Sequence, residues 1–230
     1  MIATPRFVFV HLHKSGGTFV NDCLLRYVPG ARQLGYHLPR SALPTELSHL
    51  PVLGFVRNPW SYYVSWFSFQ QSLPRQNALF NVLSASGTLS FAHTIRNMLD
   101  LAANADLRNQ VVAALPAAYS NRGLNLPGFA LQPIADSGLG FYSYLYKYMY
   151  GEAAGLHIGR MESLRTELPR LLAATGYTLS DEMQRHITTA APSNAAPHGA
   201  YRDYYDPELR DLVAARDAAV IELFRYRFDG

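Results

Sequence analysis

An apolar run that stops at a pair of glycines is the feature that most constrains this fold. The segment 6–12 is short, mostly apolar and rich in β-branched and aromatic side chains, which is typical of a buried strand. Gly16 and Gly17 follow, and apolar residues then recur at helical spacing at Phe19, Val20, Cys23, Leu24 and Tyr27. We therefore expect a strand, a glycine turn and a helix, which Pro29-Gly30 ends.

The same order of elements recurs twice along the chain. Residues 52–57 form a second predicted buried strand, and Asn58-Pro59 opens a predicted helix over 60–72 with a heavy aromatic load. Residues 157–161 are a third predicted strand, followed by a helix whose apolar face is Leu164, Leu168, Leu171 and Leu172. Alternating strands and helices favour an α/β fold with a central parallel sheet.

The remaining segments are expected to be mostly helical. Helices are predicted near 77–84, 89–103 and 107–115. Tyrosine alternates over 141–150, which allows a strand, but the intervening residues are also apolar, and we favour a helix. Core packing is the first interpretation of this aromatic run, and a pocket wall is the second.

The C-terminal region carries a clear helix signal. Asp206 is the predicted N-cap, Pro207 the first helical residue, and apolar residues from 209 to 224 line one face. We find no internal repeat and no clear linker in the 230 residues. The sequence therefore predicts a single domain over 1–230, in which 74–155 is a helical insertion.

Composition limits the classes of function. Apolar residues make up 49% and charged residues 16%, which is typical of a globular protein. A formal charge of +3 suits an anionic ligand but is too small to indicate nucleic acid. The single cysteine, Cys23, excludes an internal disulfide. The first residues lack a signal-peptide pattern, and the longest uncharged run, Gln76–Ile95, is polar. We expect a cytoplasmic protein without stable membrane insertion; its oligomeric state stays open.

The glycine turn has the chemistry of an anion cradle. Gly16 and Gly17 lack Cβ atoms, so backbone N–H groups can approach a phosphate, and the helix behind them presents its positive end. Lys14 adds a full charge, and Ser15 and Thr18 add hydroxyl donors. The alternative is a plain glycine turn with an exposed lysine.

The order of residues differs from the usual nucleotide loop. In that loop Lys and Ser/Thr follow the glycines, and the hydroxyl holds magnesium. Here Lys14 precedes them, and Arg57 follows the second strand, where a metal site would need a carboxylate. This pattern predicts direct charge neutralisation without a metal ion.

Two motifs in this order resemble a known family. The segment His13–Thr18 resembles the 5′-phosphosulfate loop of sulfotransferases that use 3′-phosphoadenosine 5′-phosphosulfate (PAPS), and Arg57-Asn58-Pro59 with Ser65 resembles their 3′-phosphate motif. The segments 201–208 and 224–228 are similar to bacterial and Golgi-type members that sulfate carbohydrates. The resemblance is weak over about 74–135. It implies a three-layer α/β sandwich of the P-loop-like sulfotransferase fold.

The resemblance also implies roles for individual residues. The expected donor is PAPS and the expected product is adenosine 3′,5′-bisphosphate (PAP), without a metal ion. The implied donor contacts are Lys14, Ser15, Gly16, Gly17, Thr18, Phe19, Arg57, Ser65, His198 and Arg202. Lys14 also has an implied catalytic role, because its charge would stabilise the leaving 5′-phosphate.

His37 is the predicted general base. It lies between the two motifs, in the region where resembling glycan O-sulfotransferases have a catalytic histidine. The alternative is a structural histidine in a polar loop. His11 and His13 alternate on the first strand, so we expect one to face the site and the other to pack. His157 is expected to be structural, and Glu162 to form a surface pair.

The predicted function is therefore transfer of a sulfuryl group from PAPS to an acceptor hydroxyl. Few charges fall between 76 and 95, so we expect a carbohydrate or glycolipid, with a small hydroxylated metabolite as the alternative. A magnesium-dependent P-loop-type kinase and a nucleotide-binding protein without catalysis are the alternatives from other classes. The helical insertion 74–155 is expected to lie on the acceptor side.

Overall fold

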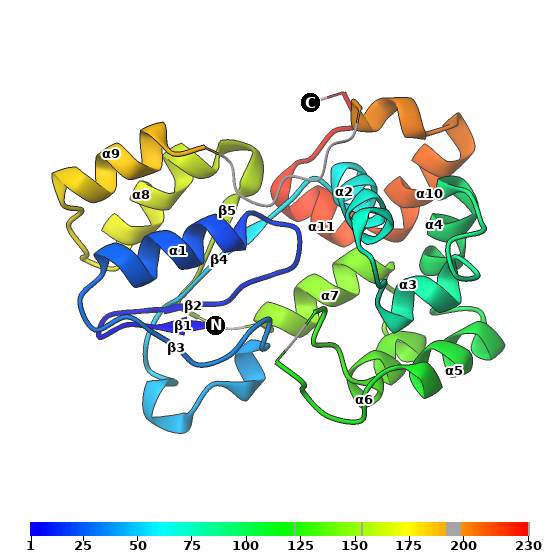
Figure 1. The fold of residues 1–230 in the computed structure, drawn as a ribbon, viewed down its shortest axis with the longest axis horizontal. Helices are drawn as coiled ribbons and strands as arrows, with labels where there is room; N and C mark the ends of the chain where they lie inside the picture. The colour runs from blue at the N-terminus through cyan, green and yellow to red at the C-terminus, as the bar shows by residue number, and fades with distance from the viewer. Residues whose placement is uncertain (122, 153, 192–198, 230) are drawn as a thin grey trace. The chain divides into compact units, whose positions relative to one another are not determined.

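The computed structural model describes residues 1–121, 123–152, 154–191 and 199–229. The chain divides into two compact units (Figure 1). Unit 1 contains Met1–Arg57, Asn121–Gly123 and Tyr148–Ala195. Unit 2 contains Asn58–Ser120, Leu124–Lys147 and Ala196–Gly230. That the whole chain acts as a single sulfotransferase domain stays a prediction.

Unit 1 is built on a five-stranded sheet in the order β3-β1-β2-β4-β5. Its strands are β1 (Ile2–Ala3), β2 (Val8–Phe9), β3 (Arg32–Gln33), β4 (Val52–Val56) and β5 (Leu156–Arg160). The pairs β2–β4 and β4–β5 are parallel, whereas β1 is antiparallel to β2 and β3. The predicted α/β fold with a mostly parallel central sheet is confirmed.

The antiparallel edge follows from a short connection. Only four residues join β1 to β2, and Thr4 closes this turn by donating its N–H to the Phe7 carbonyl at 3.0 Å. A connection of this length joins antiparallel strands, because a parallel pair needs a long crossover. The ladder of β2 also covers less than the predicted 6–12, although Val10 still donates to the Leu53 carbonyl on β4 at 2.9 Å.

Three helices cover one face of this sheet (Figure 1). They are α1 (Gly17–Tyr27), α8 (Leu164–Ala174) and α9 (Asp181–Thr189). The first two confirm the helices predicted after the first and third strands, and α9 was not predicted. Their apolar faces and the sheet form one core, to which Phe9, Phe55 and Leu168 belong. Burial of this apolar surface is the main source of stability in unit 1.

The opposite face of β4 needs a glycine. A Cβ on Gly54 would lie 2.2 Å from the ring of Tyr150. The Tyr150 hydroxyl accepts a hydrogen bond from the Phe55 N–H at 3.0 Å and donates to the Phe55 carbonyl at 2.9 Å. The tyrosine therefore approaches the strand closely enough to satisfy backbone groups in the interior.

Unit 2 is helical, as the sequence predicts. Its helices in chain order are α2 (Pro59–Ser72), α3 (Ala78–Leu83), α4 (Phe91–Leu99), α5 (Ala105–Ala114), α6 (Gly128–Leu131), α7 (Phe141–Tyr150), α10 (Pro207–Arg216) and α11 (Ala218–Phe224). The tyrosine run forms the helix α7, as predicted. The last residues of this helix, 148–150, belong to unit 1. Tyr142 is fully buried and stacks on Tyr62 of α2 at 4.0 Å between ring centroids, which favours the core-packing interpretation.

The prediction of one continuous C-terminal helix is wrong, because Asp217 separates α10 from α11. Its buried carboxylate accepts hydrogen bonds from the Tyr63 hydroxyl at 2.6 Å and the Ser143 N–H at 2.7 Å. Burial is the largest cause that raises the pKa of Asp217 to about 6. The carboxylate caps the first turn of α7. The interruption between α10 and α11 falls at this same residue.

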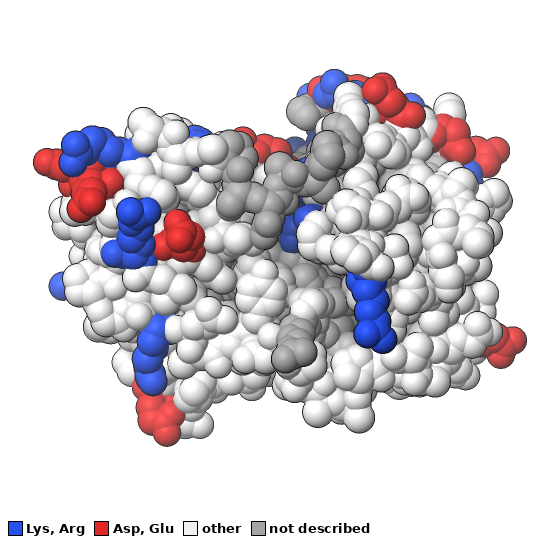
Figure 2. All heavy atoms as spheres, viewed as in Figure 1, with Lys and Arg blue, Asp and Glu red and all other residues white. Residues whose placement is uncertain are grey.

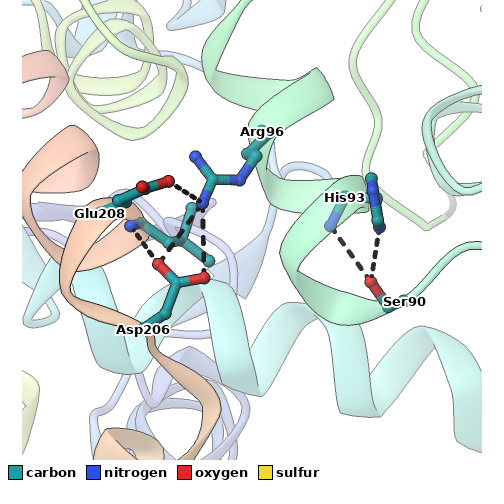
Figure 3. Close-up of polar contacts among 6 residues, drawn as sticks. Ser90, His93, Arg96, Asp206 and Glu208 are labelled. Atoms are coloured by element: carbon teal, nitrogen blue, oxygen red, sulfur yellow. Dashed lines mark hydrogen bonds and ion pairs between the residues drawn. The ribbon is translucent and has the colours of Figure 1, made fainter.

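Side chains cap the starts of α4 and α10 (Figure 3), and Asp206 confirms the predicted cap of α10. Ser90 accepts from the His93 N–H at 3.3 Å, and Asp206 accepts from the Leu209 N–H at 2.6 Å. Arg96, in the last turn of α4, reaches Asp206 and Glu208 at 3.4 Å each, so the end of α4 is linked to the start of α10 within unit 2. Such exposed ion pairs contribute little to stability.

Charges of both signs share the surface. Several Lys and Arg side chains in Figure 2 lie beside Asp or Glu side chains, which fits the small net charge of +3. Of the helices in the described ranges, none combines the length and the apolar character that a bilayer crossing requires.

Candidate anion-binding site

The glycine turn joins β2 to α1 in unit 1. Lys14 has a φ of +53° and Gly16 a φ of +78°, so the chain turns through left-handed conformations before the helix starts. Gly16 is the N-cap of α1, and in this described stretch no side chain caps the helix and no acidic residue lies in its first turn. The N–H groups of that turn are therefore oriented as an anion site requires.

Both glycines are also required by packing. A Cβ on Gly17 would lie 1.8 Å from Cδ2 of His11, and a Cβ on Gly16 would lie 2.3 Å from Cδ1 of Leu164. Because real Cβ atoms do not approach so closely, a larger residue at either position would move its neighbour. The His11 ring therefore lies directly beneath the first turn of α1.

Two cations converge on this turn. Arg57 follows β4, and its Nη1 donates a hydrogen bond to the Lys14 carbonyl at 3.1 Å. Burial, and secondly the charge of Arg57, lower the pKa of Lys14 to about 8. An anion at this position would relieve the repulsion between the two charges and raise that pKa again.

His37 lies in the loop after β3 and is 6% exposed. Its φ is +49°, an uncommon conformation for a residue other than glycine. Nδ1 lies 2.7 Å from the His11 carbonyl oxygen. A carbonyl only accepts, so Nδ1 carries the hydrogen and Nε2 keeps the lone pair. Burial is the largest cause that lowers the pKa of His37 to about 3, so the ring is neutral at pH 7.

The rings of His11 and His13 both contact His37. Each ring centroid lies 4.1 Å from that of His37, and burial lowers the pKa of both His11 and His13 well below its usual value. His11 also packs against Phe9 and beneath Gly17, and which of the two rings faces a bound donor stays a prediction. β2 ends at Phe9, so both residues lie beyond the strand, where side chains no longer alternate strictly.

Two asparagines near the histidine rings were not predicted from the sequence. Asn21 of α1 is 8% exposed and places its Nδ2 3.3 Å from Nδ1 of His11. A polar residue among the apolar positions of a predicted helix is the signal that could have found it. Asn121 accepts a hydrogen bond from the Tyr36 N–H, beside His37. It comes from 85 residues further along the chain, and no sequence signal links the two.

Three further residues predicted to contact the donor, Ser15, Thr18 and Phe19, lie in the turn or in the first turn of α1. The Ser15 hydroxyl donates to the His13 carbonyl at 3.1 Å, within the turn itself. The ring of Phe19 belongs to the core and stacks on His186 at 5.8 Å, with the Arg165 guanidinium 5.6 Å from its centroid. Thr18 follows Gly17 in the first turn of α1. The roles of all three toward a donor stay predictions.

The second motif is divided between the units. Arg57 ends the first segment of unit 1, and Asn58 begins unit 2. Asn58 caps α2, because its Oδ1 accepts from the Trp60 N–H at 3.1 Å and the Ser61 N–H at 3.4 Å. Ser65 lies on α2 and is 5% exposed. Its role toward the 3′-phosphate stays a prediction.

Of the two implied donor contacts nearest the C-terminus, His198 and Arg202, the structure describes one. His198 lies outside the described residues. Arg202 lies in a short 3₁₀ helix, Tyr201–Tyr204, where its Nε donates to the Phe228 carbonyl at 3.3 Å. Its contact with a donor stays a prediction. Within the described ranges, no group of three or more His, Cys, Asp or Glu side chains is arranged to hold a metal ion.

Comparisons with known proteins give one structural similarity to report. No family model and no curated protein matches the sequence. The structure is similar to that of mouse sulfotransferase SULT7A1 complexed with PAP, with a TM-score of 0.48 and 14% sequence identity. The match covers 99% of this chain and 90% of the mouse chain.

Proposed function

We propose that this protein is an enzyme that transfers a sulfuryl group from PAPS to a hydroxyl group of an acceptor. The supporting observation is a convergence within unit 1. The uncapped start of α1, the cations Lys14 and Arg57, and the buried neutral ring of His37 all surround the glycine turn or contact its flanks. Sulfuryl transfer to a hydroxyl group requires a site that binds the anionic donor and, beside it, a group that accepts the hydroxyl proton.

The residues of the turn fit the phosphosulfate end of the donor. Side chains at Gly16 and Gly17 would clash with Leu164 and His11, so the backbone forms the wall of the cradle. Lys14 supplies the mobile charge, and the dipole of α1 adds to it. The planar Arg57 guanidinium can donate two parallel hydrogen bonds, which suits the 3′-phosphate of the donor. Ser65 is also proposed to contact the 3′-phosphate.

His37 would act as the general base. Bound PAPS supplies a sulfuryl group on a good leaving phosphate. His37 Nε2 accepts the proton that the acceptor hydroxyl loses as its oxygen bonds to sulfur. The Nδ1–H bond to the His11 carbonyl, 2.7 Å long, stabilises the resulting imidazolium. The negative charge of the donor raises the pKa of His37 from about 3, which makes the ring a stronger base in the complex.

Lys14 would balance the charge that develops on the leaving phosphate. Its pKa of about 8 leaves it mostly protonated at pH 7, and the donor's charge raises that pKa further. In this proposal the two cations take the place of a metal ion. The proposed acceptor is a carbohydrate or glycolipid, and the alternative is a small hydroxylated metabolite.

Thermal unfolding with two nucleotides tests the donor class. We expect PAP at a hundred times its Kd to stabilise the protein by about 2.7 kcal/mol through mass action. For a chain of this size the melting temperature should then rise by roughly 5–10 °C. ATP with magnesium at the same concentration should give a smaller rise. Stabilisation by ATP with magnesium alone would favour a kinase and contradict the proposal.

Arg57→Ala should weaken PAP binding by about 10- to 100-fold, because a charged hydrogen-bond donor to a phosphate is lost. Isothermal titration calorimetry measures the change. Arg170→Ala is the matched control, since Arg170 is an exposed arginine on α8 of the same unit, paired with Glu167. If both variants lose affinity equally, the effect is one of net charge and Arg57 is not a ligand.

A further inference from the structure

We propose that Asn21 is a positioning residue that keeps His11 neutral and so directs the proton of the histidine cluster to His37. This inference rests on the proposed function, in which His37 is the base. Asn21 itself would touch neither donor nor acceptor. It would act through the His11 ring, which lies between it and His37.

The cluster has room for one additional positive charge. His11 and His13 each have a ring centroid 4.1 Å from that of His37. The charge of Lys14 also opposes protonation of these rings. The Met1 amino group does so only when it is charged, and burial lowers its pKa to about 5. Tyr36 packs edge-on against both His11 and His37. Because like charges at this distance repel, protonation of one ring disfavours protonation of the next.

Hydrogen-bond partners decide which ring takes that proton. His37 faces an acceptor, the His11 carbonyl, with its Nδ1. When Nε2 of His37 is protonated, Nδ1–H still donates to the His11 carbonyl, and the positive charge of the ring strengthens this hydrogen bond. His11 faces a donor, the Asn21 amide, with its Nδ1 at 3.3 Å. Protonation of that nitrogen would set two donors against each other and break the bond. The proton therefore goes to His37 and not to His11.

Packing holds the His11 ring in this orientation. The ring is 3% exposed, stacks on Phe9 with centroids 6.2 Å apart, and lies beneath Gly17. Asn21 lies four residues after Gly17, one helical turn along α1. The start of α1, the His11 ring and the position of His37 are therefore fixed by the same contacts.

The test is the tautomer of each histidine, read from ¹⁵N chemical shifts at pH 7 without donor or acceptor. In the wild-type protein we expect the hydrogen on Nε2 of His11 and on Nδ1 of His37. In Asn21→Asp the side chain keeps its shape but only accepts, so the hydrogen of His11 should move to Nδ1. The kcat for sulfuryl transfer should fall at least tenfold in this variant.

Leu25→Asp is the matched control. Leu25 lies one turn further along α1 and is 42% exposed, so this variant adds the same charge to the helix away from His11. It should leave both tautomers and kcat unchanged, and the KM for PAPS should change no more in Asn21→Asp than in this control.

Two results would overturn the inference. One is a hydrogen on Nδ1 of wild-type His11, which would mean that Asn21 accepts through Oδ1 and does not donate; this measurement needs no variant to fold. The other is full kcat in Asn21→Asp with the His11 tautomer reversed. Failure of PAP to bind, with the expected tautomers present, would instead overturn the proposed function.

Discussion

His37→Ala should lower kcat by about 10²- to 10⁴-fold, the usual contribution of a positioned general base. PAP affinity should change by no more than about twofold, because the cradle of α1 remains. Single-turnover transfer from labelled PAPS to an acceptor measures the first quantity, and calorimetry with PAP measures the second. The split between turnover and binding is what a base predicts.

His37→Asn is the matched control for this experiment. The φ of His37 is +49°, and asparagine tolerates that left-handed conformation better than other side chains. Its amide can still donate to the His11 carbonyl but has no basic lone pair. We expect His37→Asn to be as slow as His37→Ala. Near-normal turnover in the asparagine variant would show that the loop conformation matters and that the imidazole is not the base.

Much of the local structure of the cradle could be predicted from the sequence. The order of apolar strand, Gly16-Gly17 and helical spacing predicts β2 and α1, and Asn58-Pro59 predicts the start of α2. These signals are local, since each depends on residues within one or two turns of the chain. The short antiparallel-paired strands β1 and β3 carry no such signal, because two residues are too few to show a period.

Features that depend on distant residues could not be predicted. Asp217 interrupts the C-terminal helix because its carboxylate meets Tyr63 and Ser143, which lie 154 and 74 residues away. The apolar positions on either side of it continue one helical pattern, so periodicity alone predicts one helix. A buried aspartate that caps another helix is a tertiary effect that overrides local preference.

The histidine cluster shows the same limit within the candidate site. The sequence indicates His37 as a base only through its resemblance to a family, and says nothing of its tautomer. The 2.7 Å bond from Nδ1 to the His11 carbonyl and the 4.1 Å contacts with His11 and His13 supply that chemistry. They arise because the loop after β3 returns to the end of β2, 26 residues earlier.

Lys14→Ala should lower kcat by about 10²- to 10³-fold, because a preorganised cation at the developing charge of the leaving phosphate is lost. It should also weaken PAP binding, unlike His37→Ala. Lys14→Arg keeps the charge in a different shape and should recover most of the affinity but less of the turnover. Turnover within a few fold of wild type in Lys14→Ala would contradict the role of Lys14.

The pH dependence of PAP binding gives Lys14 a second, independent test. Burial and Arg57 lower its pKa to about 8 in the free protein, whereas a bound anion raises it. The complex therefore holds more protons than the free protein above pH 8. PAP affinity should be nearly constant below pH 7, fall about twofold between pH 7 and 8, and then fall by up to about tenfold per pH unit, as expected for one linked proton. In Lys14→Arg this alkaline fall should disappear, since arginine stays charged. An unchanged fall in that variant would assign the titration to another group.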